Sequence, residues 1–155
     1  MKLFILKFKK KMKDDFKIKL TTLEDTKSFA KEISKIIKPK TFISLRGKLG
    51  VGKTTLVREI INILSKKKQK VPSPTFSIVN TYNSRIGRIW HYDLYRIQNK
   101  NEIFNLDYDI ALLECVIVEW PEIIKDFFPR KRIEIHLKED LEFSRSAILR
   151  KINYD

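Results

Sequence analysis

Cysteine and glycine are both scarce in this sequence. Its 155 residues include one cysteine and four glycines. A lone cysteine cannot form an internal disulfide, which excludes a disulfide-stabilised scaffold. Cys115 begins the apolar run Cys115–Val118, a setting typical of a buried core thiol rather than of a nucleophile or a metal ligand. We therefore expect a protein of a reducing compartment, the cytoplasm.

Long hydrophobic runs are missing as well. The apolar patch Leu3–Leu6 is followed by a lysine and is far shorter than the roughly 20 residues of a membrane-spanning helix. It is also too short for the apolar core of a secretion signal. The sequence thus predicts neither secretion nor a membrane partner.

Acidic residues are too few to balance the basic ones. The chain has 33 Lys and Arg against 19 Asp and Glu, a net charge of +14, and residues 1–20 hold eight lysines and two aspartates. This balance fits either a solvated lysine-rich surface or contact with an acidic partner, RNA being the natural candidate. From length and charge we predict a basic N-terminal extension at residues 1–15 and a single domain at 16–155.

Hydrophobic periodicity predicts strands that alternate with helices. Thr21 or Thr22 is expected to cap the first helix, which ends before Pro39, and Thr21 with Glu24 has the spacing of a capping box. A hairpin with its turn at 83–85 is predicted inside the second half. The predicted strands are 16–20, 41–45, 76–82, 86–94, 116–119, 133–137 and 143–152, and the further helical segments are 54–64, 101–106 and 121–127. This order is typical of an α/β domain with a mixed sheet.

Three of the four glycines stand in one short segment, Gly47–Thr54, which matches the phosphate-loop pattern G-x-x-x-x-G-K-T/S. A strand precedes it and an amphipathic helix follows it. Phosphates require a concave set of backbone N–H groups at a helix N-terminus, and glycine allows that backbone shape. Lys53 is then expected to contact the β- and γ-phosphates, and the Thr54 hydroxyl to bind Mg²⁺.

Further groups are needed for nucleotide chemistry. Glu119 ends the buried strand, where an acid can reach the metal, although a strand-end Glu can also simply pair with a surface lysine. Asp93 lies on one strand face with His91 and could orient water, or it could only organise hydrogen bonds. Thr75 follows a proline and could contact phosphate or metal as part of a switch segment. The other interpretation of that segment is a proline turn.

Four segments together resemble one family. They are Gly47–Arg58, Ser73–Phe76, His91–Arg96 and Val118–Glu122, and in order and spacing they are similar to the TsaE (YjeE) family of bacterial P-loop ATPases, which is needed for threonylcarbamoyladenosine modification of tRNA. The resemblance implies a three-layer, P-loop NTPase-like fold with a mixed, mainly parallel sheet. It also implies a slow ATPase that acts on TsaD-like and TsaB-like proteins of the modification complex and reaches tRNA indirectly.

The resemblance assigns roles to individual residues. It implies that ATP and Mg²⁺ are bound at the loop, with Thr54 and Glu119 on the metal and a catalytic set of Lys53, Thr75, Asp93 and Glu119. A segment near the adenine is implied at Leu23–Thr26. The implied nucleotide-binding residues are Leu49, Gly50, Val51, Gly52, Lys53, Thr54 and Thr55.

The sequence departs from the family pattern at three positions. Lys48 replaces an acid in the loop, and Glu59 and Asp107 replace glycines. Because Asp tolerates the left-handed conformation better than most residues, we expect Asp107 to keep the local backbone shape.

Two other functions stay open at this point. A small-molecule P-loop kinase would share the loop, and a basic RNA-binding module could use nucleotide only as a structural ligand.

Overall fold

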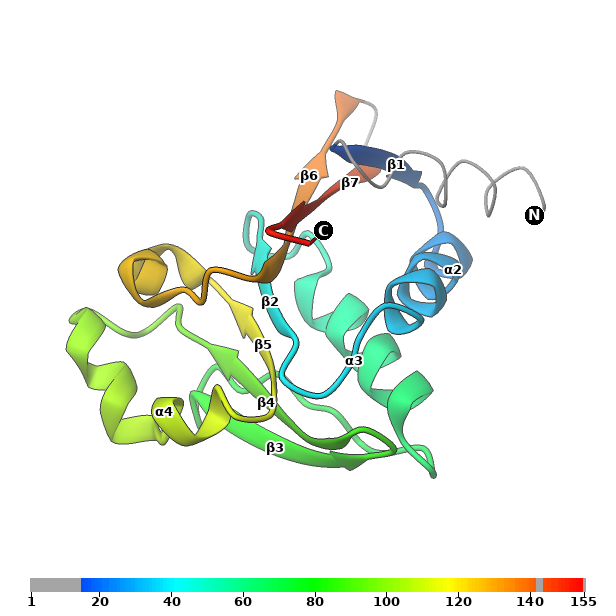
Figure 1. The fold of residues 1–155 in the computed structure, drawn as a ribbon. Helices are drawn as coiled ribbons and strands as arrows, with labels where there is room; N and C mark the ends of the chain where they lie inside the picture. The colour runs from blue at the N-terminus through cyan, green and yellow to red at the C-terminus, as the bar shows by residue number, and fades with distance from the viewer. Residues whose placement is uncertain (1–14, 142–143, 155) are drawn as a thin grey trace.

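One seven-stranded sheet organises the molecule (Figure 1). The structure is a computed structural model and describes residues 15–141 and 144–154. The strand order is β1-β7-β6-β2-β5-β4-β3. The strands are β1 (Phe16–Leu20), β2 (Phe42–Arg46), β3 (Val79–Ser84), β4 (Gly87–Asp93), β5 (Cys115–Glu119), β6 (Arg132–Glu139) and β7 (Arg145–Ile152).

The sheet is mixed, as the sequence predicts. The three central pairings, β6 with β2, β2 with β5 and β5 with β4, are parallel. The outer pairings, β1 with β7, β7 with β6 and β3 with β4, are antiparallel. Parallel pairing is therefore confined to the centre and does not form the majority, because short connections join β3 to β4 and β6 to β7 and make each pair antiparallel.

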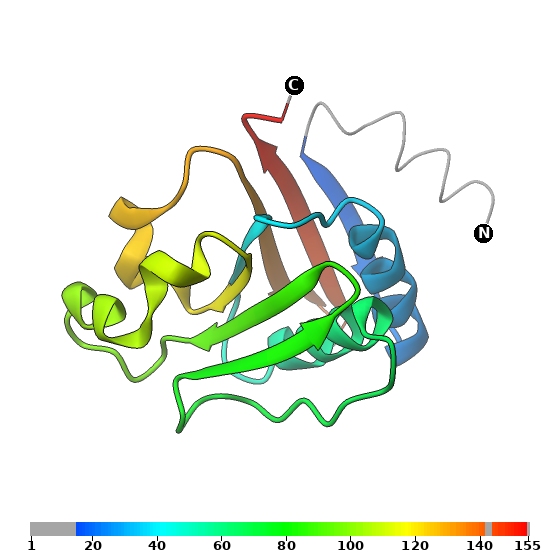
Figure 2. The same ribbon diagram turned by 60° about the horizontal axis from the view of Figure 1, so that its bottom comes forward.

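Helices cover both faces of this sheet and make three layers (Figures 1 and 2). The helices α2 (Leu23–Ser34) and α3 (Lys53–Leu64) pack on one face, and η1 (Lys100–Leu106), α4 (Tyr108–Ala111) and η2 (Pro121–Phe127) on the other. Alternate residues of a strand enter opposite cores: Ile117 of β5 packs with the first group, and Val116 and Val118 pack with the second. Such strands are apolar throughout because both of their faces are buried.

The start of α2 corrects one prediction. The capping box joins Thr22 with Asp25, not Thr21 with Glu24. The Asp25 carboxylate accepts the Thr22 and Thr21 backbone N–H groups at 2.7 and 2.9 Å. Because Leu23 is the first helical residue, the third position of the helix belongs to Asp25.

Other element boundaries also shift. The first hairpin strand begins at Val79 rather than residue 76, and its turn lies at Arg85 and Ile86, where Gly87 follows with φ +104°. The segments 101–106 and 121–127 are 3₁₀ helices, and α4 was not predicted. The start of the last predicted strand, Phe143, lies outside the described residues.

Two predictions about single residues are confirmed. Cys115 is buried, and burial raises the pKa of its thiol to about 12, so the thiol stays protonated and unreactive. Asp107 adopts the left-handed conformation, with φ 57° and ψ 30°.

The predicted N-terminal extension, residues 1–15, lies outside the described part of the chain except for Asp15, which pairs with Arg150. Within the described residues, no helix has the length and apolar character needed to cross a membrane.

Candidate functional site

The carboxyl ends of three parallel strands meet at one edge of the sheet. Glu119 at the end of β5 lies in register with Leu45 of β2 on one side and with Asp93 of β4 on the other. The glycine-rich loop begins at Gly47, directly after Arg46, the last residue of β2. Ligands of open α/β sheets bind at this kind of edge.

Glycine is required in the loop for two different reasons. Gly47 has φ +148°, and a Cβ there would lie 2.7 Å from the Leu137 carbonyl oxygen of β6 and 2.8 Å from Cγ1 of Val51. Gly50 has φ +76°, but a Cβ there would meet no atom within 4 Å. The first position needs glycine for space as well as for conformation, and the second needs it for conformation alone.

The loop leads into α3 without a side-chain cap. Gly52 is the capping residue, with a left-handed backbone, and as a glycine it has no side chain that could bond to the first backbone N–H groups of the helix. The first backbone N–H groups of a helix lack partners inside the helix. An anion at this end would satisfy them and would interact favourably with the helix dipole.

The Lys53 ammonium is buried against the loop. Its Nζ donates to the carbonyl oxygens of Gly47 and Lys48, at 2.7 and 2.9 Å. It also lies 3.9 Å from the centre of the Trp120 ring. Burial lowers the pKa of Lys53, while the nearby carboxylates, Glu119 first, act in the opposite direction. The site thus has a desolvated cation placed for a negatively charged ligand.

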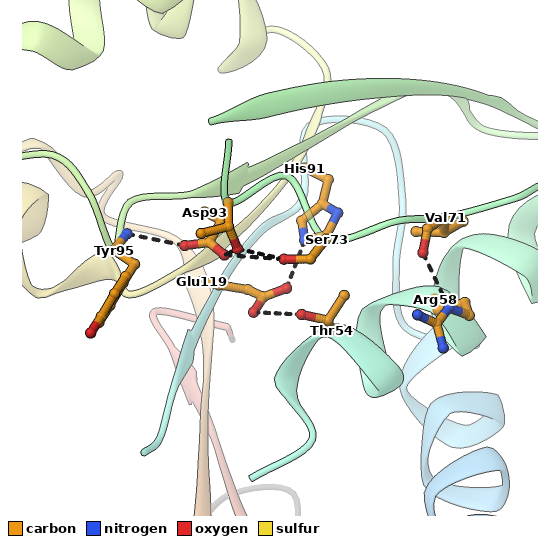
Figure 3. A network of polar contacts seen from close by, with 9 residues as sticks. Thr54, Arg58, Val71, Ser73, His91, Asp93, Tyr95 and Glu119 are labelled. Atoms are coloured by element: carbon orange, nitrogen blue, oxygen red, sulfur yellow. Dashed lines mark hydrogen bonds and ion pairs between the residues drawn. The ribbon is translucent and has the colours of Figure 1, made fainter. Parts of the chain in front are cut away.

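Glu119 links the helix to the neighbouring strand (Figure 3). Its Oε2 accepts the Thr54 hydroxyl at 3.1 Å, and its Oε1 lies 2.8 Å from Nε2 of His91. Glu119 is 2% exposed and His91 is fully buried. Within the described part of the chain no lysine forms an ion pair with Glu119, so its partners here are those of a buried site and not of a surface pair.

A second cluster surrounds Asp93. Its Oδ2 accepts the Thr75 hydroxyl at 2.8 Å and lies 3.4 Å from the Ser73 hydroxyl, and its Oδ1 accepts the Tyr95 backbone N–H at 3.0 Å. Ser73 and Thr75 also contact each other at 2.7 Å. The segment leading to Ser73 is tied to α3 where Arg58 Nε donates to the Val71 carbonyl, as Figure 3 shows.

These groups surround one cavity of about 220 Å³. Nine of the ten predicted nucleotide, metal and catalytic residues line it, namely Leu49, Gly50, Gly52, Lys53, Thr54, Thr55, Thr75, Asp93 and Glu119. The tenth, Val51, has its side chain in the hydrophobic core and its backbone N–H on the Lys48 carbonyl. None of the residues Leu23–Thr26 lines this cavity.

Two residues that line the cavity were not among the predicted site residues. Ser73 and Trp120 line the cavity, and His91 holds Glu119. Trp120 has φ 53°, a conformation that nothing in its side chain predicts, and its ring packs 4.9 Å from that of Tyr95. Their positions in the sequence could have identified them, since Trp120 directly follows Glu119 and Ser73 stands two residues before Thr75.

The cavity provides some, but not all, of the oxygen ligands that a hard cation such as Mg²⁺ needs. Thr54 and Glu119 offer adjacent oxygen atoms. Among the described residues no group of three or more His, Cys, Asp or Glu side chains is arranged to hold a metal by itself. Mg²⁺ commonly takes only one or two protein ligands and completes its shell with phosphate oxygens and water, so these residues fit a metal that arrives with a nucleotide.

The strand, the glycine loop with its helix, and the acid ending the adjacent parallel strand define a P-loop NTPase-like α/β protein. The crystal structure of Bacillus subtilis YdiB is similar to this chain, with a TM-score of 0.75, 26% sequence identity, and coverage of 90% of this chain and 87% of YdiB.

Sequence comparisons identify the family within this class. Residues 20–147 match the model of the family described as threonylcarbamoyl adenosine biosynthesis protein TsaE. The tRNA threonylcarbamoyladenosine biosynthesis protein TsaE of Rickettsia bellii is 41% identical over 120 residues, covering 77% of this chain and 83% of that protein. Its Bacillus subtilis counterpart is 34% identical over 115 residues, covering 74% and 72%. The chain belongs to the TsaE family, whose role is in tRNA threonylcarbamoyladenosine biosynthesis.

Proposed function

We propose that this chain binds ATP with Mg²⁺ in the 220 Å³ cavity, hydrolyses it slowly, and thereby supports threonylcarbamoyladenosine modification of tRNA by acting on TsaD-like and TsaB-like proteins. The observation that carries the proposal is the contact between Thr54 Oγ1 and Glu119 Oε2, 3.1 Å apart and beside the buried Lys53 ammonium.

The loop side of the cavity supports phosphate binding. Lys53 now donates to carbonyl oxygens of its own loop. A phosphate oxygen would be a stronger acceptor for this ammonium, since hydrogen bonds between two charged groups are shorter and stronger than those to neutral carbonyls. The uncapped N–H groups of α3 would contribute further donors.

Thr54 and Glu119 would hold Mg²⁺. The bound metal ion would neutralise part of the negative charge on the phosphates. Asp93 lies beside them with its Oδ2 bonded to Thr75. This carboxylate would orient a water molecule, and the Ser73–Thr75 segment would respond to the γ-phosphate as a switch segment does.

The lining also supports slow turnover by the isolated chain. Lys53 is the one cationic side chain among the described residues that line the cavity, and the Arg145 guanidinium, whose Nη1 lies 3.0 Å from the position of a Cβ on Gly52, is not among them. An arginine that stabilises transition-state charge accelerates comparable reactions by about 10³–10⁵-fold. A partner protein would supply or order the missing group.

Reconstitution of tRNA modification tests this function. Purified TsaD-like and TsaB-like proteins would be combined with the wild-type chain, Lys53→Ala or Glu119→Ala, and modified tRNA would be measured. We expect product over repeated cycles only with the wild type. Equal product from all three proteins would reject the proposal.

A simpler measurement uses Trp120 in the isolated chain. Its ring contacts the Lys53 ammonium, so its fluorescence should change when Mg-ATP binds. An unchanged spectrum at saturating nucleotide would contradict the placement of ATP in this cavity.

A further inference from the structure

A second and larger cavity lies at the other end of the sheet from the glycine loop. It measures about 590 Å³ and is formed where three chain segments meet, namely residues 35–41 before β2, Lys131 before β6, and the end of β7 with Tyr154. Because the loop follows the carboxyl end of β2, the length of that strand separates the two cavities. In Figure 2 the C-terminal end of β7 lies at the top, and the loop leading into α3 lies toward the bottom, at the opposite end of the strands.

Positive charge dominates this second cavity. Among the described residues that line it, five of nine are lysines and none is acidic: the lysines are Lys35, Lys38, Lys40, Lys131 and Lys151. Lys35 pairs with Glu32 at 2.5 Å. We call this feature the lysine cavity. A concave surface lined by charge of one sign focuses the electrostatic potential and attracts ions of the opposite sign.

Tyr154 organises part of the lysine cavity. The ammonium of Lys131 lies 4.7 Å from the centre of its ring, and that of Lys151 lies 5.5 Å away. Thr41 lines the cavity beside it, and its hydroxyl accepts the Lys38 backbone N–H at 2.9 Å. These contacts hold cations from different segments around one aromatic ring, so little ordering is needed when an anion binds.

Size and residue type favour a polyanion. The lysine cavity is more than twice the size of the 220 Å³ cavity beside the glycine loop, and its exposed lysines Lys38, Lys40 and Lys131 offer more than one positive charge to a ligand. Protein interfaces are depleted in lysine and use aromatic and arginine anchors. Lysines instead contact the phosphates of nucleic acids as point charges, without reading the sequence.

We propose that the lysine cavity binds the sugar–phosphate backbone of RNA. The choice of RNA rests on the proposed function, because a protein that acts on the tRNA modification complex works beside tRNA. The binding itself requires neither ATP nor the partner proteins. Contact through phosphates predicts affinity that varies little with sequence and falls steeply with salt.

The test measures binding of a fluorescently labelled, unmodified tRNA to the full chain by anisotropy over a range of salt concentrations. The test variant replaces three exposed lysines of the cavity, Lys38→Gln, Lys40→Gln and Lys131→Gln. The control replaces three exposed lysines of a different surface, Lys66→Gln, Lys67→Gln and Lys68→Gln, and changes the net charge equally. Unfolding midpoints verify that both variants fold.

We expect the cavity variant to bind at least about tenfold more weakly and to lose about 2 units of salt slope, since each phosphate contact contributes roughly 0.7–0.9. The control should stay within about twofold of the wild type. Equal weakening of both variants would show attraction by net charge alone and would overturn the proposal, as would an absence of wild-type binding.

A last measurement distinguishes a failure of this proposal from a failure of the proposed function. ATP-dependent Trp120 fluorescence should be the same in the cavity variant as in the wild type. A variant that binds tRNA normally but fails in the reconstituted modification reaction would overturn RNA as the ligand and indicate an acidic protein surface instead.

Discussion

Alanine substitution at two loop glycines should affect different properties of the protein. At Gly47, a Cβ would lie 2.7 Å from a backbone carbonyl oxygen of β6, which the strand pairing holds in place. Conformational strain of about 1–3 kcal/mol and overpacking of about 1–3 kcal/mol give an expected destabilisation of about 2–6 kcal/mol for Gly47→Ala.

Gly50→Ala is the matched comparison. Its added Cβ meets no atom within 4 Å, so only the left-handed conformation is unfavourable. That cost is about 1–2 kcal/mol. The same substitution should weaken ATP binding at least about tenfold, because Gly50 lines the cavity and its backbone shape aims the loop N–H groups.

Urea and thermal unfolding followed by circular dichroism measure the difference. Each kcal/mol corresponds to about 2–4 °C in a chain of this size, so Gly47→Ala should lower Tm by roughly 4–24 °C and Gly50→Ala by a smaller amount, about 2–8 °C. ATP affinity is measured in parallel by calorimetry. Equal destabilisation by both substitutions, or a larger effect at Gly50, would refute the steric reasoning.

Three other predictions concern stability and reactivity. Asp25→Ala should cost about 1 kcal/mol through loss of the capping box. Hydrogen bonds from Thr22 hold the pKa of Asp25 below its usual value, so urea unfolding should show the full loss above about pH 4 and a shrinking loss as the pH falls further; a loss that grows in acid would contradict this. Asp107→Val should cost about 1–2 kcal/mol, because a β-branched residue resists φ 57°, and Asp107→Asn should lie within about 0.5 kcal/mol of the wild type; equal unfolding free energies for both would show that the backbone relaxes. A disulfide reagent at pH 8 should leave Cys115 unmodified in the folded chain and modify one thiol in urea, whereas rapid reaction of the folded chain would exclude a buried thiol.

Strand and helix positions near the site could be predicted because their signals are local. The apolar run ending at Glu119 identifies a central strand, and the glycine pattern identifies the loop with its helix. The antiparallel pairing of β3 with β4 could also be predicted, because a turn-like gap separates two strand patterns. The place of β7 in the sheet could not, because its periodicity fits either direction, and its antiparallel pairing with β6 and β1 depends on a short connection and on the shared core.

The site residues also fall into those that the sequence predicts and those that only the structure shows. Lys53, Thr54, Glu119 and Asp93 could be placed from motifs, and the structure brings them to one cavity. The contact between His91 and Glu119 could not, because it depends on the register of β4 against β5. The lysine cavity could not be predicted from the sequence either, since its lysines run from Lys35 to Lys151, more than 100 positions apart in the chain.

Calorimetric titration of ATP, with and without Mg²⁺, tests the central claim most directly. The wild type should bind more tightly with Mg²⁺. Lys53→Ala should lose most of its affinity in both conditions, because the proposal places the buried ammonium against the phosphates. Glu119→Gln should bind ATP normally without the metal but gain no affinity when Mg²⁺ is added. Full Mg²⁺-enhanced binding by Glu119→Gln would contradict the assignment of Thr54 and Glu119 to the metal.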